Sequence, residues 1–277
     1  MQVVERKVKL DRGVKRVEVL LAGCLHIGHR ACREDDIRAM VRYIEAAPNR
    51  RLILLGDVTD SINVSDPRFN PQEIAPWIAT EDLSDRLILE AERAVDILKP
   101  IRDRIDGLVI GNHENKPKRN HQLDVHRILK QGLDVDSMGM IGFLQYTFVG
   151  RDRGESAPIV FYLEHGSGGA STVGNVLNKM VKRAKDFPGA DVVAGAHHHR
   201  NGATTAETVL YDPKDRKIVH KPTLCVTVGT FLRYHLPNQT SYGEMFNMDP
   251  HGIGPGNVVL APWDKVERVS YRFPYWS

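Results

Sequence analysis

The sequence contains few cysteines, and their number argues against a disulfide framework. Only 3 of its 277 residues are cysteine, an odd number in a chain long enough to bury a sizeable hydrophobic core. Disulfide-stabilised folds are typical of small secreted domains, whereas thiols stay reduced in the cytosol. We therefore expect free cysteines and a cytoplasmic protein.

The sequence also lacks the marks of membrane, secreted and low-complexity proteins. No apolar run approaches the roughly 20 residues of a membrane-spanning helix. The start of the chain, MQVVERK, alternates apolar and charged residues and lacks the apolar core of a secretory signal. A net charge of +3 permits an anionic substrate without requiring nucleic acid as a partner. These absences predict a soluble globular protein with no membrane partner and leave its oligomeric state open.

Short apolar runs alternate with amphipathic segments along most of the chain. Runs at 16–23 and 51–56 are typical of strands, and helical spacing follows at 37–44 and at 83–105, where Pro100 predicts a bend. Alternating strands and helices followed by consecutive strands predict one α/β domain over residues 1–277, a four-layer α-β-β-α sandwich with two mixed sheets. We also expect an edge strand at 1–7, strands at 108–110, 143–149, 159–164, 191–195, 223–229, 257–260 and 266–273, a helix at 173–184 and a hairpin turn at 212–215.

Five segments place metal-binding side chains directly after apolar runs. Open α/β sheets hold their ligands at the carboxyl ends of their strands, so we expect these segments to converge. Imidazole, carboxylate and amide oxygen suit borderline divalent metals, and the number of side chains is sufficient for two ions. The segments are Cys24-Leu25-His26, Gly56-Asp57-Val58-Thr59-Asp60, Gly111-Asn112-His113-Glu114, Glu164-His165-Gly166 and His197-His198-His199.

The order of these segments closely resembles that of the calcineurin-like binuclear metallophosphoesterase superfamily. Its pattern is Asp-x-His, Gly-Asp-x-x-Asp, Gly-Asn-His-Asp/Glu, His and Gly-His-x-His. The resemblance extends from Gly23 to His199, with Cys24 in place of the aspartate and Ala196 in place of the last glycine. It implies that His26, His199 and Cys24 bind a first metal and that Asp57 bridges both ions. Asn112, His165 and His197 would complete the second metal site.

The resemblance also implies a mechanism, in which a hydroxide bridging two divalent ions attacks phosphorus and both ions neutralise the phosphoryl oxygens. His113 would face the substrate as a general acid or electrostatic stabiliser. Glu114 and Asp60 would orient ligands from behind, although an acidic residue at position 60 is also a common local cap.

Cys24 has two interpretations. It is either a thiolate ligand, which favours iron or zinc over manganese at that ion, or an ordinary buried cysteine beside a weak or absent first metal. The RNA lariat debranching enzymes are similar here, with Gly-Cys-x-His and Gly-Asn-His-Glu, and this likeness implies a cysteine ligand. The chain departs from that subfamily after His165, so the likeness does not extend to the substrate.

Two further segments have both a functional and a structural interpretation. The basic stretch with Lys116, Lys118 and Arg119 either binds a phosphate or nucleic-acid backbone or forms a solvated loop. The residues at 61–80 are expected to form a long loop beside the site. Four aromatic residues near the end of the chain either line the mouth of the site or pack against the sheet: Phe231, Tyr234, Tyr242 and Phe246.

The sequence favours a metal-dependent phosphoesterase that uses two ions of manganese, iron or zinc. Its substrate would be a phosphodiester in a nucleotide or nucleic acid, because of the basic stretch and the cysteine variant. The alternatives are a phosphomonoesterase or nucleotidase, and a binding scaffold of the same fold that has lost catalysis.

Overall fold

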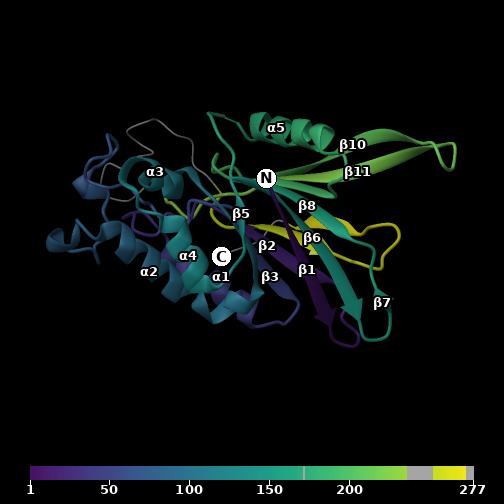
Figure 1. Ribbon diagram of the computed structural model, residues 1–277, viewed down its shortest axis with the longest axis horizontal. Helices are drawn as coiled ribbons and strands as arrows, with labels where there is room; N and C mark the ends of the chain where they lie inside the picture. Colours follow the sequence, from purple (N-terminus) through teal and green to yellow (C-terminus); the bar gives the residue numbers. More distant parts are fainter. Residues whose placement is uncertain (171, 236–251, 273–277) are drawn as a thin grey trace.

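Two β-sheets pack face to face in the computed structural model of the chain, and helices cover their outer faces (Figure 1). The structure describes residues 1–170, 172–235 and 252–272. The predicted α-β-β-α sandwich with two mixed sheets is confirmed. In the part of the chain described, no helix is both long and apolar enough to cross a membrane. The three cysteines are free.

The six-stranded sheet has the order β13-β12-β2-β3-β4-β5. Its central strands run parallel from β2 to β5, and β12 pairs antiparallel with β2. The carboxyl ends of β2, β3 and β4 therefore lie along one edge. The strands are β2 (Val17–Ala22), β3 (Arg50–Leu54), β4 (Ile105–Val109), β5 (Ser137–Gly139), β12 (Gly256–Leu260) and β13 (Val269–Arg272).

The seven-stranded sheet has the order β1-β6-β8-β9-β11-β10, with β7 paired to β6. The N-terminal strand β1 is at its edge, as predicted, and β8 runs parallel to β9. Strands β10 and β11 form a long hairpin that projects from the body of the protein (Figure 1). The strands are β1 (Gln2–Leu10), β6 (Ile141–Gly150), β7 (Gly154–Glu155), β8 (Ile159–Glu164), β9 (Val192–Gly195), β10 (Gly202–Asp212) and β11 (Lys217–Thr227).

Side chains alternate between two cores along the central strands, as the period of two in a β-strand requires. Leu20 and Leu52 face the helices, whereas Leu21 and Ile53 face the other sheet. Helices α1, α2 and α4 cover the six-stranded sheet, and α5 covers the seven-stranded one (Figure 1). The helices are α1 (Glu34–Glu45), α2 (Arg86–Leu98), α3 (Asn112–His121), α4 (Val125–Leu133) and α5 (Val173–Asp186).

Some predicted elements differ from those observed. The long helix expected at 83–105 ends at Leu98 and continues as a 3₁₀ helix, Lys99–Arg104, because Pro100 lacks the amide that an α-helix would use. Ile105, assigned to that helix, begins β4. The interpretation of the basic stretch as a loop is wrong, because Lys116, Lys118 and Arg119 lie on α3. Helix α4 was not predicted, and Phe273 lies outside the described residues.

Candidate metal centre

The five motif segments meet where the carboxyl ends of β2, β3 and β4 face those of β8 and β9. Backbone hydrogen bonds join the first two loops: the Cys24 amide donates to the Gly56 carbonyl at 2.9 Å, and the His26 amide to the Asp57 carbonyl at 3.1 Å. On the other sheet, the Ala196 amide donates to the His165 carbonyl at 3.0 Å. The two sheets thus bring the motifs together from opposite sides.

Two glycines allow the loops after β3 and β4 to touch. Gly56 has a φ of +84°, and a Cβ there would lie 2.5 Å from the Gly111 nitrogen. A Cβ on Gly111 would lie 2.2 Å from Asp57 Oδ1. Both distances are shorter than a side chain tolerates, so only glycine permits this approach. The aspartate therefore lies directly against the loop that contributes Asn112 and His113.

We call the seven predicted ligands the ligand cluster: Cys24, His26, Asp57, Asn112, His165, His197 and His199. Two trios within it have ligand atoms within 4.8 Å of one another, and Cys24 belongs to both. One trio joins Cys24 to His26 and His199, and the other joins it to Asp57 and His165. The two trios therefore lie side by side and have the Cys24 sulfur in common.

Three acceptor atoms converge around His165. Its Nδ1 donates to the Leu55 carbonyl at 2.6 Å, and its Nε2 lies 3.0 Å from Asp57 Oδ2 and 3.0 Å from Asn112 Oδ1. Burial lowers the pKa of this imidazole, but the Asp57 carboxylate outweighs burial and raises that pKa to about 9. A positive charge, either a proton or a metal cation, is therefore required between these atoms. The donor set fits a divalent metal ion.

In the trio of Cys24, His26 and His199, two imidazole nitrogens face each other. His26 Nε2 lies 3.4 Å from His199 Nε2, and the Nδ1 of His199 is hydrogen-bonded to the Tyr234 hydroxyl. Burial lowers the pKa of His26, so its ring is neutral at physiological pH. Two imidazole rings that direct their nitrogens at one point also fit a shared cation.

His197 and Cys24 are neighbours across the two sheets. The His197 amide donates to Cys24 Sγ at 3.3 Å, and its ring centroid lies 5.2 Å from that of His165. Among the described residues, His197 is in neither trio. Burial, and secondly the Asp57 charge, raise the pKa of the Cys24 thiol far above its ordinary value. A thiolate at this position therefore requires a bound cation.

Five members of the ligand cluster have left-handed backbone conformations, which residues other than glycine rarely adopt. The φ values are 53° for Cys24, 50° for His26, 51° for Asp57, 69° for His197 and 55° for His199. Backbone strain of this kind concentrates at functional sites, where the surrounding structure enforces it. The hydrogen bonds between the loops enforce it here.

His113 lies beside the cluster, and two residues fix its ring. Its Nδ1 donates to the Asp60 carbonyl, and its Nε2 lies 3.2 Å from Arg68 Nη1. His113 also forms a third trio of ligand atoms with His26 and Asp60. Arg68 was not predicted, because no motif marks an arginine within a loop of irregular sequence.

Asp60 is held by a buried ion pair that sequence reasoning also missed. Arg86 Nη2 donates to Asp60 Oδ2 at 2.8 Å, while Asp60 Oδ1 lies 3.6 Å from His26 Nδ1, beyond hydrogen-bonding distance. Glu90, which is fully buried, accepts from Arg86 and from the Ser61 amide. Burial raises the pKa of Glu90 to about 8. Helix α2 thus supports Asp60 from behind.

Glu114 ties the loops after β3 and β4 together. Its carboxylate accepts four backbone amides: Asp57 at 3.0 Å, Val58 at 2.6 Å, Thr59 at 3.2 Å and Gly111 at 3.1 Å. The residue is 1% exposed. A buried carboxylate with four amide donors holds both loops rigidly, because each amide would otherwise lack a partner.

We expect Glu114→Gln to destabilise the fold by about 2–4 kcal/mol, because the new NH₂ group would face two backbone amides that need an acceptor. In a chain of this size the melting temperature should fall by about 4–15 °C. Differential scanning calorimetry of the metal-free protein measures this effect. Glu45→Gln, an exposed position at the end of α1, is the control. Equal melting temperatures for the two variants would contradict the role of Glu114.

The three basic residues expected to contact the substrate all lie on α3, but they have different surroundings. Lys116 and Arg119 line a recess together with Asn112, whereas Lys118 pairs with Asp124 at 2.7 Å. The aromatic residues also separate: Tyr234 contacts His199, and Phe231 packs in the core beneath α1 and α2. Tyr242 and Phe246 lie outside the described residues.

No family model and no curated protein sequence matches the chain. Solved structures do match it. A calcineurin-like phosphoesterase, YfkN from Bacillus subtilis, is 14% identical, with a TM-score of 0.33 over 65% of this chain and 61% of the other. The NAD nucleotidase NadN of Haemophilus influenzae is 9% identical, with a TM-score of 0.41 over 93% and 49%.

A putative 5'-nucleotidase from Staphylococcus aureus is 12% identical to the chain, with a TM-score of 0.45 over 93% of this chain and 53% of the other. This chain therefore spans between about half and two thirds of the length of these three proteins. The solved structures to which it is similar thus include a calcineurin-like phosphoesterase and two nucleotidases.

Proposed function

We propose that the chain is a metal-dependent phosphoesterase of the calcineurin-like superfamily, a single domain over residues 1–277 that binds two divalent ions in the ligand cluster. The observation that carries this proposal is the meeting of Asp57, His165 and Asn112 around one point. The trio of Cys24, His26 and His199 lies beside them. When bound, two divalent metal ions supply a water of lowered pKa and positive charge for the phosphoryl oxygens.

The residues of the chain hold this site in one geometry. The Leu55 carbonyl fixes the His165 tautomer, leaving Nε2 directed at Asp57. Asp57 Oδ1 accepts the His113 amide at 2.9 Å, which ties the start of α3 to the site. His113 is the proposed proton donor to the leaving oxygen, because its ring lies beside the cluster, with its centroid 4.7 Å from that of His26. Arg68 is positioned to hold the same ring.

We also propose which metal ions the site binds, which substrate it cleaves and where in the cell the protein acts. A thiolate from Cys24 favours iron or zinc at the ion beside His26 and His199, whereas the oxygen and nitrogen atoms of Asp57, Asn112 and His165 also accept manganese. The basic residues beside Asn112 favour a phosphodiester in a nucleotide or nucleic acid over a phosphomonoester. Three free cysteines are consistent with a cytoplasmic setting.

The test is a panel of phosphomonoesters and phosphodiesters offered to chelated protein reloaded with manganese, iron or zinc. We expect about two ions per chain and hydrolysis that is lost on chelation and restored on reloading. Cleavage of monoesters alone would reject the diester assignment. Protein that binds no metal and hydrolyses nothing would reject the enzyme in favour of a scaffold.

Cys24 offers a separate prediction with a matched control. Cys24 and Cys225 are both fully buried, but Cys225 lies in the core beneath α5, away from the ligand cluster. We expect Cys24→Ser to lower the metal content by up to one ion per chain, because a hydroxyl is a weaker ligand than a thiolate. Cys225→Ser should keep both ions. Elemental analysis and activity measure the difference, and identical results for the two variants would exclude Cys24 as a ligand.

A further inference from the structure

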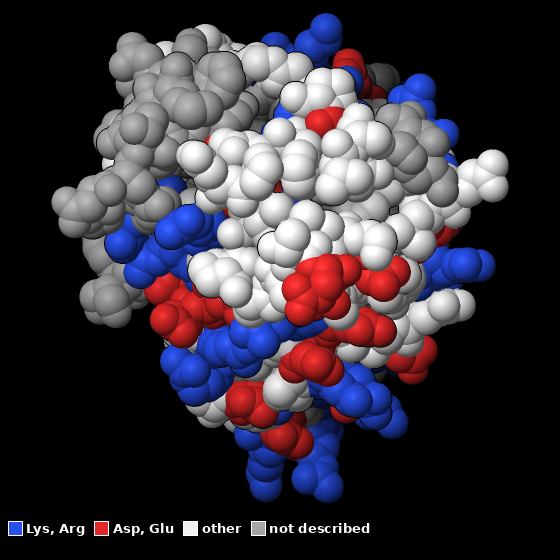
Figure 2. All heavy atoms as spheres, turned by 90° about the vertical axis from the view of Figure 1, so that its left-hand side faces the viewer, with Lys and Arg blue, Asp and Glu red and all other residues white. Residues whose placement is uncertain are grey.

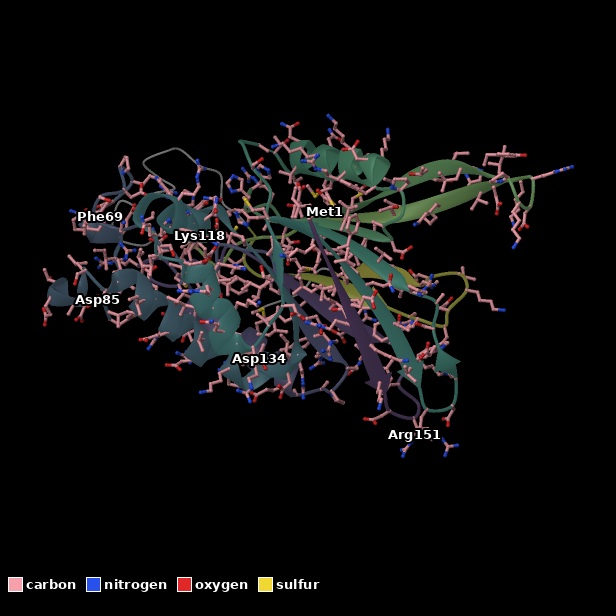
Figure 3. All side chains as sticks on the ribbon, viewed as in Figure 1. Met1, Phe69, Asp85, Lys118, Asp134 and Arg151 are labelled. Atoms are coloured by element: carbon pink, nitrogen blue, oxygen red, sulfur yellow. The ribbon has the colours of Figure 1, made fainter. Side chains whose placement is uncertain are left out.

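A recess of about 500 Å³ begins at the ligand cluster and extends along helix α3. Its lining residues recur at intervals of three and four, so they form one face of the helix, and Arg68 faces them from the loop after Asp60. In Figure 3, Phe69 and Lys118 mark this loop and this helix at the same end of the molecule. The lining residues are Arg68, Asn112, Asn115, Lys116 and Arg119.

The recess carries more positive than negative charge. Lys116 Nζ and Arg68 Nη2 both contact Asp66 Oδ2, at 2.8 and 3.0 Å, so one carboxylate is shared by two cations. Arg119 is exposed and makes no ion pair with any described residue. An anion that enters the recess therefore meets one unpaired guanidinium and two cations that are only partly neutralised.

The position of this charge constrains the ligand. Asn112 and Arg119 are two turns apart on the helix, about 10 Å along its axis. The two phosphorus atoms of a pyrophosphate are joined by a single oxygen, so a pyrophosphate spans only a small part of this distance. A phosphate separated from the reacting one by a ribose extends farther and suits this spacing.

Among the described residues that Figure 2 shows, this end of the molecule carries no broad basic surface. In Figure 2 basic and acidic side chains are interspersed on the face that contains this end. The net charge of the chain is only +3. A long duplex needs an extended row of phosphate contacts, so these observations favour a short ligand with localised charge.

We propose that the recess binds a second, non-reacting phosphate of the substrate, so that the preferred substrate is a nucleotide phosphodiester with another phosphate across the same sugar. Arg119 and Lys116 would hold that phosphate, while the reacting phosphate lies at Asn112. This inference rests on the proposed phosphoesterase function and specifies its substrate class.

The test compares two substrates that differ by one phosphate: the 4-nitrophenyl ester of thymidine 5'-phosphate, and the same compound with a 3'-phosphate. For wild-type protein we expect kcat/KM to be about 5-fold higher for the 3'-phosphorylated compound, because an ion pair with a guanidinium is worth roughly 1 kcal/mol at an exposed site. Arg119→Gln should lower this ratio by more than half, with Lys116 retaining the remainder, and Arg119→Lys should retain most of it.

Lys118→Gln is the matched control, because it removes the neighbouring charge of the same helix from a side chain that pairs with Asp124 instead. It should leave the ratio of the two substrates as in the wild type. A wild-type ratio of one, or an equal fall of the ratio in the Arg119 and Lys118 glutamine variants, would overturn the recess as a phosphate site.

Calorimetric binding separates this inference from the proposed function. Thymidine 3',5'-bisphosphate should bind the metal-loaded protein more tightly than thymidine 5'-phosphate, and Arg119→Gln should reduce the difference by more than half. If neither nitrophenyl ester is hydrolysed, the phosphoesterase proposal fails, while the binding difference still decides the recess. Equal affinity of wild-type protein for the two nucleotides would overturn it independently of turnover.

Discussion

Asp57→Asn is expected to lower phosphoester hydrolysis by about 10³-fold and to reduce the bound metal below two ions per chain. The substitution removes the negative charge beside His165 and places an NH₂ group 3.0 Å from its Nε2. That group would donate to the imidazole and occupy the lone pair that a metal needs. Loss of several kcal/mol of charge stabilisation corresponds to this reduction in rate.

A suitable control for this variant is Asp134→Asn. Asp134, labelled in Figure 3, ends α4 and has a φ of 52°, so the same substitution is made in the same backbone conformation. Asparagine tolerates that conformation. Metal analysis and kcat should be unchanged by the control. If Asp57→Asn retained two tightly bound ions and full activity, Asp57 would not be a bridging ligand.

His113→Ala is expected to lower kcat by about 10²- to 10⁴-fold while the metal content stays at the wild-type value. The loss should be larger for an alkyl phosphodiester than for a 4-nitrophenyl ester, since an alkoxide needs a proton to leave and nitrophenolate does not. His220→Ala, at an exposed histidine of the projecting hairpin, controls for the loss of an imidazole.

The two readouts distinguish three roles for His113. It forms a trio of possible ligand atoms with His26 and Asp60, so a loss of metal in His113→Ala would identify it as a ligand. Equal losses of kcat for good and poor leaving groups would identify an electrostatic stabiliser in place of a proton donor. Only retained metal with a leaving-group dependence supports general acid catalysis.

The sequence predicted the sandwich and the meeting of the motifs because both depend on short-range patterns. Where an apolar run ends in glycine and metal-binding residues, those residues lie at the end of a strand, whatever conformation the following loop adopts. Strands β8 and β12 begin and end within a residue of their predicted limits. The end of β4, at Leu108 and Val109, and the position of Asp57 follow from the same signal.

The supporting residues could not be predicted, since their roles depend on contacts distant in sequence. Arg86 and Glu90 sit on α2 at ordinary helical positions, yet both are buried behind Asp60. Arg68 lies in an irregular loop and is recognised only by its contact with His113. Helix α3 was missed because Pro117 interrupts its pattern, and proline normally signals a loop.

The left-handed backbone at five ligand positions limits how such a centre can be transplanted. Each of these conformations costs about 1 kcal/mol or more for a residue with a side chain, so the loops adopt them only with their hydrogen-bonded partners in place. A protein designer who copied the seven side chains onto another sandwich would reproduce the chemistry without its geometry. The transferable unit is the set of loops after β2, β3 and β9 together with the carboxylate of Glu114 that clamps the loop after β3.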